Sequence, residues 1–205
     1  NSELEAMLLK RLGQSYYKIG KFVEAGNAFE GSWMAQKGDH EVYSLWGDSL
    51  MAQGRYNEAI KFLNLSLKYL GKQADIYAKI GYCYAKVADA KINKIRTEGA
   101  SVRKEKKRDS IRRRDKKTRF EYTPARTGQH GSQIRQLTLA LKDEILALYD
   151  QGIRECRKAL FVDPNLSEEE NHLNDVKSKK AQFLAWIEKA FGSEKAPEPA
   201  KPKKK

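Results

Sequence analysis

The sequence has few cysteines and no long apolar run. Its 205 residues include two cysteines, Cys83 and Cys156, which are too few for a disulfide framework. Both lie in helical patterns, so we expect reduced, buried thiols and an intracellular location, cytoplasmic or in an organelle matrix, with the nucleus also possible. No stretch approaches the roughly 18–20 apolar residues that a membrane span needs, so no membrane span is expected.

Residue patterns that carry catalysis are also scarce. The sequence contains neither a phosphate-binding glycine loop nor a nucleophile elbow, and its carboxylates are scattered over predicted helix surfaces. Of the three histidines, His40, His130 and His172, we expect solvated or structural roles and no metal ligation. The chain is therefore predicted to have no enzymatic activity and no catalytic residues, and to bind no cofactor, metal or small-molecule substrate.

The positive charge is concentrated in two segments. The formal net charge is +13, yet residues 91–127 alone carry 15 Lys and Arg against five Asp and Glu. Residues 193–205 add five Lys against two Glu. The remaining sequence is balanced, so a neutral body carries two basic appendages. This separation favours a specific anionic partner over a general effect on solubility.

Two segments resemble each other at a spacing of 34 residues: LLKRLGQSYYKIGKFVEAGNAF at 8–29 and YSLWGDSLMAQGRYNEAIKFL at 43–63. The small residues in these segments are predicted to let two helices approach closely, while one glycine in each lies in the turn between them. Each unit reads as an amphipathic helix pair that must stack on its neighbours. The equivalent positions are Gly13 and Gly47, Gly20 and Gly54, Phe22 and Tyr56, Ala25 and Ala59, and Ser32 and Ser66, with Gly81 one further step along.

This pattern resembles the tetratricopeptide repeat (TPR) family, whose motif is W-x2-L-G-x2-Y…A-x3-F…P. Both segments lack the closing proline and have Lys37 and Gly71 in its place. The resemblance implies an all-α solenoid of three helical hairpins that acts as an adaptor or scaffold in protein–protein interaction. The matching residues are Leu9, Leu12, Gly13, Tyr16, Ala25 and Phe29 in the first repeat, and Tyr43, Trp46, Gly47, Leu50, Ala59 and Leu63 in the second.

The third repeat is predicted to be split by an insertion. Its first helix, from about Asp75, lacks a turn glycine, and its second helix returns at 145–165, where Pro164 closes the unit. We expect an antiparallel helical stalk whose tip, between Gly99 and Gly131, contains helix-breaking Pro124, Gly128 and Gly131. The predicted divisions are repeats one and two plus the first helix of repeat three at 1–90, the basic insertion at 91–132, the return helix at 133–165, a capping helix at 166–192 and a disordered Pro/Lys tail at 193–205.

The concave face of such a solenoid is lined by the first helix of each repeat, and we expect it to hold a protein partner. One subclass of the family clamps a C-terminal carboxylate with Lys and Asn side chains, as in chaperone co-factors. Lys10 matches that clamp, but Gln14, Leu45, Asp75 and Lys79 depart from it, so chaperone-tail binding is not expected. The predicted groove residues are Lys10, Gln14, Tyr17, Lys18, Leu45, Asp48, Met51, Lys79, Tyr82 and Lys86.

The basic insertion contains RKEKKRDSIRRRDKKTR at 103–119, in which 11 of 17 residues are Lys or Arg. Like charges at helical spacing repel one another, so this segment is predicted to meet a polyanion. RNA is the first choice because aromatic residues that could stack on bases follow the run. The predicted polyanion-binding residues are Arg103, Lys104, Lys106, Lys107, Arg108, Arg112, Arg113, Arg114, Lys116, Lys117, Arg119, Phe120 and Tyr122.

These features favour a component or assembly factor of a large ribonucleoprotein, such as a ribosome. Two alternatives remain open from the sequence. One is a structural component of a cytoskeletal or ciliary assembly, with the basic segment on acidic tubulin tails. The other is a soluble adaptor in which the basic run is a nuclear-import signal; anionic membrane surfaces share the same chemistry.

Overall fold

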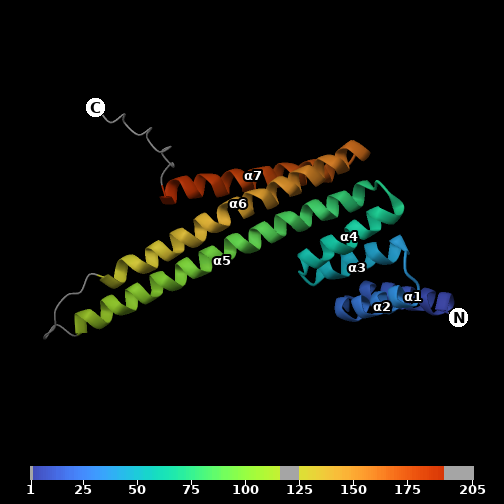
Figure 1. Ribbon diagram of the computed structural model, residues 1–205, viewed down its shortest axis with the longest axis horizontal. Helices are drawn as coiled ribbons and strands as arrows, with labels where there is room; N and C mark the ends of the chain where they lie inside the picture. Colours follow the sequence, from blue (N-terminus) through green and yellow to red (C-terminus); the bar gives the residue numbers. More distant parts are fainter. Residues whose placement is uncertain (1, 116–124, 192–205) are drawn as a thin grey trace, which may run out of the picture.

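The computed structural model describes residues 2–115 and 125–191, with side chains over 2–98 and 135–189, and every element in these ranges is an α-helix. Figure 1 shows their arrangement. The predicted capping helix, 166–192, corresponds to the last of them, while the 193–205 tail lies outside the described residues. The helices are α1 (Ser2–Lys18), α2 (Phe22–Ala35), α3 (His40–Ala52), α4 (Tyr56–Leu70), α5 (Ala74–Asp115), α6 (Ala125–Val162) and α7 (Ser167–Phe191).

The helices form a stack of hairpins. α1 packs on α2, α3 on α4 and α5 on α6, and each hairpin contacts the next through α2 and α3, α4 and α5, and α6 and α7. In Figure 1 the long α5, α6 and α7 lie side by side, α4 lies beside the N-terminal part of α5, and α1 and α2 lie on the far side of α3. The predicted all-α stack of helical hairpins is confirmed. In the described ranges, no helix combines the length and apolarity needed to cross a membrane.

Glycines set the spacing within each hairpin. A methyl group at Gly13 would lie 2.6 Å from the Phe29 ring, and one at Gly47 would lie 2.8 Å from Leu63. Non-bonded carbon atoms do not come this close to one another. Glycine at these positions therefore allows the two helices of each hairpin to pack in close contact. The turn glycines Gly20 and Gly54 have φ values of 78° and 75°, as the repeat pattern predicted.

The third hairpin repeats this contact with residues that are distant in the sequence. A methyl group at Gly81 would lie 2.7 Å from Cys156 Sγ and 3.2 Å from the Gly152 carbonyl oxygen. Cys156 and Gly152 therefore occupy, opposite Gly81, the positions that Leu63 and Ala59 hold opposite Gly47. α6 therefore packs on α5 at Gly81 as α2 packs on α1 at Gly13.

Two buried serines repeat one hydrogen bond. Ser32 Oγ donates to the Ala6 carbonyl at 2.8 Å, and Ser66 Oγ donates to the His40 carbonyl at 2.9 Å. In both cases a second helix is tied to the start of the first helix of its own hairpin. The bond satisfies a buried hydroxyl while allowing the close helix contact.

The hydrophobic core has two parts. One part fills the hairpins α1/α2 and α3/α4 and the start of α5, and is built from Ala25, Phe29, Val42, Trp46, Leu50, Ala59, Ile60, Leu63, Ile76, Ile80 and Cys83. The other joins α5, α6 and α7, and is built from Ala85, Ala88, Ile92, Ile95, Ile145, Tyr149, Val176, Phe183 and Ile187. α7 thus covers an apolar surface that the third hairpin would otherwise expose, as expected of a capping helix.

The stalk is longer and more regular than the sequence indicated. α5 has 42 residues and α6 has 38, and the two helices pack side by side. The predicted start of the tip at Gly99 and the predicted helix breaks at Gly128 and Gly131 are wrong, because α5 continues through Gly99 to Asp115 and α6 already contains Gly128 and Gly131. A helical glycine costs only about 1 kcal/mol relative to alanine, which leaves the helix intact here. Residues 116–124, with Pro124, lie outside the described residues.

Asp39 joins the first two hairpins. Its carboxylate accepts hydrogen bonds from the backbone amides of Glu41 and Val42, which caps α3. Lys10 Nζ lies 2.9 Å from Asp39 Oδ2 and 2.9 Å from Glu41 Oε2. Burial opposes ionisation of Asp39, but Lys10 and the two amides outweigh it and lower the pKa of this carboxyl group.

Replacing Gly81 should test the close approach of α5 and α6. Gly81→Ala is expected to lower the free energy of unfolding by about 1–3 kcal/mol, because the new methyl group meets the Gly152 backbone as well as Cys156. Gly26→Ala is the matched control, since its methyl group would lie 3.5 Å from Gln53 Nε2 and alanine favours helix by about 1 kcal/mol. Urea unfolding measures the free energy of unfolding of both variants. A Gly81→Ala protein as stable as Gly26→Ala would contradict the described packing.

Two substitutions of Asp39 should separate capping from charge. Asparagine also caps helices, so Asp39→Asn is expected to cost at most about 1 kcal/mol, from the lost pairing with Lys10. Asp39→Ala should cost about 0.5–2 kcal/mol more, because the cap is lost too.

The charge contribution of Asp39 should depend on pH. Because its pKa is lowered in the folded state, the stabilisation is present above the ordinary value of 3.8 and is lost as the pH falls through the folded-state pKa. The stability difference between wild type and Asp39→Asn should therefore narrow in acid. Chemical unfolding across a pH series measures it, and a difference that widened in acid would contradict the assignment.

Candidate functional site

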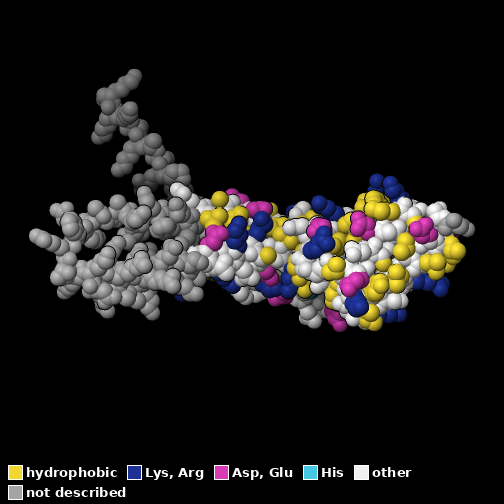
Figure 2. All heavy atoms as spheres, turned by 90° about the horizontal axis from the view of Figure 1, so that it is seen from below, with side chains coloured by type: hydrophobic (Ala, Val, Ile, Leu, Met, Phe, Trp, Pro, Cys, Tyr) yellow, Lys and Arg dark blue, Asp and Glu magenta, His cyan; other side chains and the backbone are white. Residues whose placement is uncertain are grey.

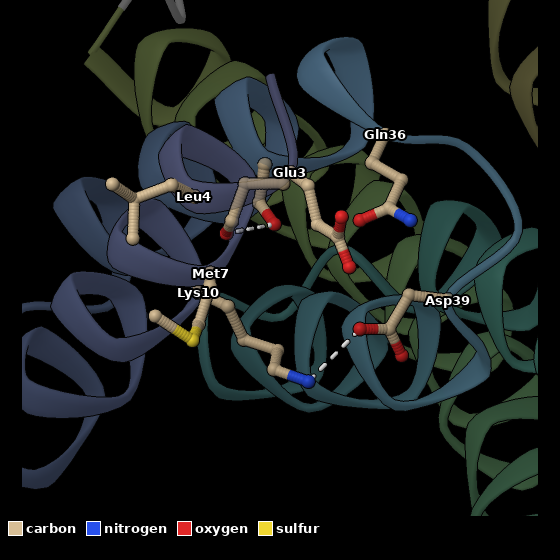
Figure 3. A pocket seen from close by; sticks show the side chains of 8 residues that line it. Glu3, Leu4, Met7, Lys10, Gln36 and Asp39 are labelled. Carbon is tan, nitrogen blue, oxygen red and sulfur yellow. Dashed lines mark hydrogen bonds and ion pairs between the residues drawn. The ribbon is translucent and has the colours of Figure 1, made fainter. Parts of the chain in front are cut away.

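The predicted groove begins at the N-terminal end, where α1 faces the start of α3. Lys10 is held by Asp39 and Glu41, and Gln14 Nε2 donates to Glu41 Oε1 at 3.2 Å. Figure 3 shows Lys10 extending from α1 towards Asp39. The positive charge of Lys10 is thus already matched by two carboxylates of the same chain.

An open pocket lies beside this ion pair. It has a volume of about 390 Å³, and Glu3, Met7 and Gln36 surround it together with Lys10 and Asp39 (Figure 3). Its wall mixes carboxylate, amide and thioether groups. Such a surface can bind a polar segment of a partner, with methionine supplying an adaptable apolar contact.

The middle of the groove is a polar cluster from three helices. Lys79 Nζ of α5 lies 2.8 Å from Asp48 Oδ2 of α3. Burial raises the pKa of Asp48 by more than the hydrogen bond from Lys79 lowers it, and nearby Asp75 raises it further. Burial also raises the pKa of Tyr17 on α1, with Asp48 adding to the effect. The structure therefore brings together three of the predicted residues, Tyr17, Asp48 and Lys79.

Aromatic rings meet at the C-terminal end of the groove. The Tyr82 ring lies edge-on to Tyr56, with centroids 6.1 Å apart, and 5.5 Å from the His172 ring of α7. Lys86 Nζ lies 5.0 Å from the centre of the Tyr82 ring. The predicted residues Tyr82 and Lys86 thus form a cation–π pair, and α7 extends the groove beyond the third hairpin.

The remaining predicted groove residues have other surroundings. Leu45 and Met51 are half-buried and pack against the first core part, so packing accounts for much of their apolar character. Lys18, the last residue of α1, is exposed. Figure 2 shows that basic, acidic and apolar side chains are interspersed over the described part of one face of the molecule.

Both cysteines are buried and electrostatically unsuited to nucleophilic chemistry. Burial raises the pKa of Cys83 to about 12, and Asp48 contributes to the shift. Burial also raises the pKa of Cys156, with a hydrogen bond to Glu169 as the next cause. Thiols of this kind stay protonated at neutral pH and are poor nucleophiles.

A side-chain cluster that the sequence analysis missed joins α6 to α7. Cys156 Sγ, a carboxylate oxygen of Glu169 and an imidazole nitrogen of His172 all lie within 4.8 Å of one another. The sequence predicted a solvated or structural role for His172 and no metal ligation; the structure places two potential co-ligands beside it. Glu169 precedes it by three residues, which places both side chains on one face of a helix; this spacing was the available signal. Cys156 lies on a different helix, so only the folded structure shows that it belongs to the same cluster.

The predicted polyanion-binding side chains, Arg103 to Tyr122, lie outside the described residues. The backbone of 103–115 is described and forms the distal part of α5, away from α1 to α4 (Figure 1). Their role stays a prediction from the sequence and from this placement.

The chain was compared with protein families, curated proteins and solved structures. No protein-family model matches the sequence, and no curated protein matches it. Among solved structures, the Arabidopsis OM64 TPR domain has a TM-score of 0.53 at 11% identity, covering 87% of this chain and 99% of that one.

Two TPR structures of RPAP3 are also similar. The first TPR of Spaghetti (RPAP3) bound to the HSP90 peptide SRMEEVD has a TM-score of 0.51 at 15% identity, covering 89% of this chain and 95% of that one. The first TPR domain of human RPAP3 has a TM-score of 0.50 at 15% identity, with coverages of 91% and 98%. Together with the glycine contacts and turn geometry described above, these similarities show that the chain has the helical-hairpin fold of the TPR domains.

Proposed function

We propose that this protein is a non-catalytic TPR adaptor that holds a protein segment in its groove and docks on a polyanion, RNA in the first place, through its basic stalk. The observation that carries the proposal is the separation of two surfaces. A mixed polar and aromatic face lines the first helices of the hairpins, and the basic segment lies at the distal end of α5. Such a protein fits a component or assembly factor of a large ribonucleoprotein, such as a ribosome.

The chemistry of the groove argues for a partner other than an acidic chain end. The similar RPAP3 domain is described as bound to the peptide SRMEEVD. In the present groove, Lys10 is matched by Asp39 and Glu41, and Lys79 by Asp48. A carboxylate-rich peptide would have to displace these pairs. Tyr17 and Tyr82 instead favour a partner segment with aromatic or apolar anchors.

The charge distribution along the stalk supports a polyanion partner. Near the body, Lys91 of α5 is paired with Glu144 of α6 at 2.9 Å. Further out, residues 122–142, which include the distal part of α6, contain no Asp or Glu. The partner helix therefore offers no carboxylate to the 11 Lys and Arg residues of 103–119. An external polyanion would relieve the repulsion among them.

RNA is favoured among polyanions because Phe120 and Tyr122 directly follow the basic run. Aromatic rings beside arginines can stack on unpaired bases, an interaction that an acidic peptide cannot provide. The acidic tails of tubulin and a nuclear-import receptor are the competing partners, and they would be recognised by charge.

The peptide SRMEEVD is a direct test of the groove. We expect binding no tighter than about 1 mM, the level of a few weak contacts, because the groove lysines are already paired. Isothermal titration of the full chain with this peptide and with its C-terminally amidated form gives the answer. Micromolar binding that is lost on amidation and in Lys10→Ala would show a carboxylate clamp and contradict the proposed groove chemistry.

The basic run can be tested without shortening the stalk. Six substitutions to glutamine, at Arg112, Arg113, Arg114, Lys116, Lys117 and Arg119, should weaken binding to a single-stranded RNA. The slope of log affinity against log salt should become shallower by about 4, at about 0.7 per phosphate contact. Fluorescence anisotropy across a salt series measures both effects.

The matched control replaces the five tail lysines, Lys195, Lys201, Lys203, Lys204 and Lys205, with glutamine. It removes a similar charge from the second basic segment, and most of the RNA affinity should remain. Equal losses in the two variants would show a general charge effect. Equal affinity for RNA and for a polyglutamate chain of the same charge would overturn the preference for RNA and favour the tubulin-tail alternative.

A further inference from the structure

We propose that Cys156, Glu169 and His172 form a zinc site that fastens α7 to α6. Cys156 lies on α6, while Glu169 and His172 lie on the first turns of α7. Their donor atoms, a sulfur, a carboxylate oxygen and an imidazole nitrogen, lie within 4.8 Å of one another. The proposal does not depend on the adaptor function, because it concerns the opposite end of the third hairpin from the basic segment.

The burial of Cys156 and Glu169 is the second observation that supports a metal site. Cys156 is fully buried, and Glu169 is only 9% exposed. A glutamate is almost never so buried unless it is paired or coordinates a metal. Among the described residues, no lysine or arginine forms an ion pair with Glu169, whose hydrogen-bond partner is the thiol of Cys156.

Two polar atoms in the cluster lack partners. Glu169 Oε1 and His172 Nε2 are both buried, and neither has a hydrogen-bond partner among the described residues. Two orphaned polar atoms beside a buried thiol are costly, since a buried acceptor without a partner loses its hydration and gains nothing. A bound cation would satisfy the carboxylate oxygen, the imidazole nitrogen and the sulfur together.

The ligand set selects the metal. Sulfur and imidazole nitrogen favour a borderline or soft divalent ion, and zinc accepts these ligands together with carboxylate oxygen. With zinc–ligand bonds of about 2.0–2.3 Å in a tetrahedron, ligand atoms lie about 3.3–3.6 Å apart. The observed separations of up to 4.8 Å require a contraction of about 1 Å, which is within reach of side-chain rotation.

Coordination would change both charge and structure. The Cys156 thiol would lose its proton to solvent and bind as the thiolate, while Glu169 binds as carboxylate and His172 through its free Nε2. Three protein ligands leave the fourth position of zinc to water or to a group from a partner. The His172 ring lies 5.5 Å from Tyr82, so the site would also fix the C-terminal end of the groove.

Cobalt provides the spectroscopic test. The full chain is reduced, freed of metal with a chelator, and titrated with Co²⁺ and then with Zn²⁺. We expect one equivalent of Co²⁺ to produce a thiolate-to-cobalt charge-transfer band, which Zn²⁺ then removes. The midpoint of thermal unfolding should rise with the logarithm of the free Zn²⁺ concentration, because zinc binds the folded state.

Substitutions assign the ligands. Cys156→Ala should abolish the charge-transfer band, and Glu169→Gln and His172→Gln should each weaken binding by at least about tenfold, the lower end of what loss of even an outer-shell partner causes. The matched controls are Cys83→Ala, which removes the other buried thiol, and Glu168→Gln, which changes the exposed neighbour of Glu169. Both controls should bind Co²⁺ within about twofold of wild type.

Glutamine has nearly the size and shape of glutamate, so Glu169→Gln is expected to fold normally. Far-ultraviolet circular dichroism checks that the variant keeps the helix content of the wild type. Absence of the charge-transfer band in the wild-type chain would overturn the proposal. A band of equal strength in Cys156→Ala, or one lost in Cys83→Ala, would overturn it as well, because zinc would then bind elsewhere.

Discussion

The close contact of two helices at a glycine is the constraint on which the rest of the structure depends. At Gly13, Gly47 and Gly81 a side chain from the second helix lies within 2.8 Å of where a Cβ atom would be. This contact fixes the distance and rotation of each hairpin, and the stacked hairpins then place their first helices along one face. The pairing of Lys79 with Asp48 and the meeting of Tyr82 with His172 follow from that arrangement.

The same constraint bears on the long helices α5 and α6. Gly81 and Cys156 are far apart in the sequence, yet they make the contact that Gly13 makes with Phe29, and Gly47 with Leu63, within short hairpins. The parts of α5 and α6 that continue beyond this contact must therefore leave the third hairpin side by side. Continuing both helices is the simplest way to meet this condition, because each helix satisfies its own backbone and covers an apolar face of the other.

Local pattern was enough to predict the hairpins, their turn glycines and the return at Cys156, because these depend on residue size and helical period. The helix breaks at Gly128 and Gly131 were predicted wrongly, because glycine disfavours helix locally, whereas the packing of α6 on α5 is a contact between distant segments that local pattern does not contain. Cys156 is brought next to Glu169 and His172 by the packing of α7 on α6. The sequence spacing indicated only that Glu169 and His172 share one face of a helix. Leu45 and Met51 show the reverse case, in which a predicted surface position also serves the core.

The helical geometry of the stalk fixes the distance between the body and the end of α5. Between Lys91, which forms an ion pair with Glu144 of α6, and Asp115 at the end of α5, a helix rising 1.5 Å per residue covers about 36 Å. Length and direction are coupled in such an arm, because each residue added also turns the tip by about 100°. Changes of about seven residues in each helix preserve the side on which the tip presents its side chains, whereas changes of five turn it well away. Reach can therefore vary in steps of about 10 Å, and not continuously.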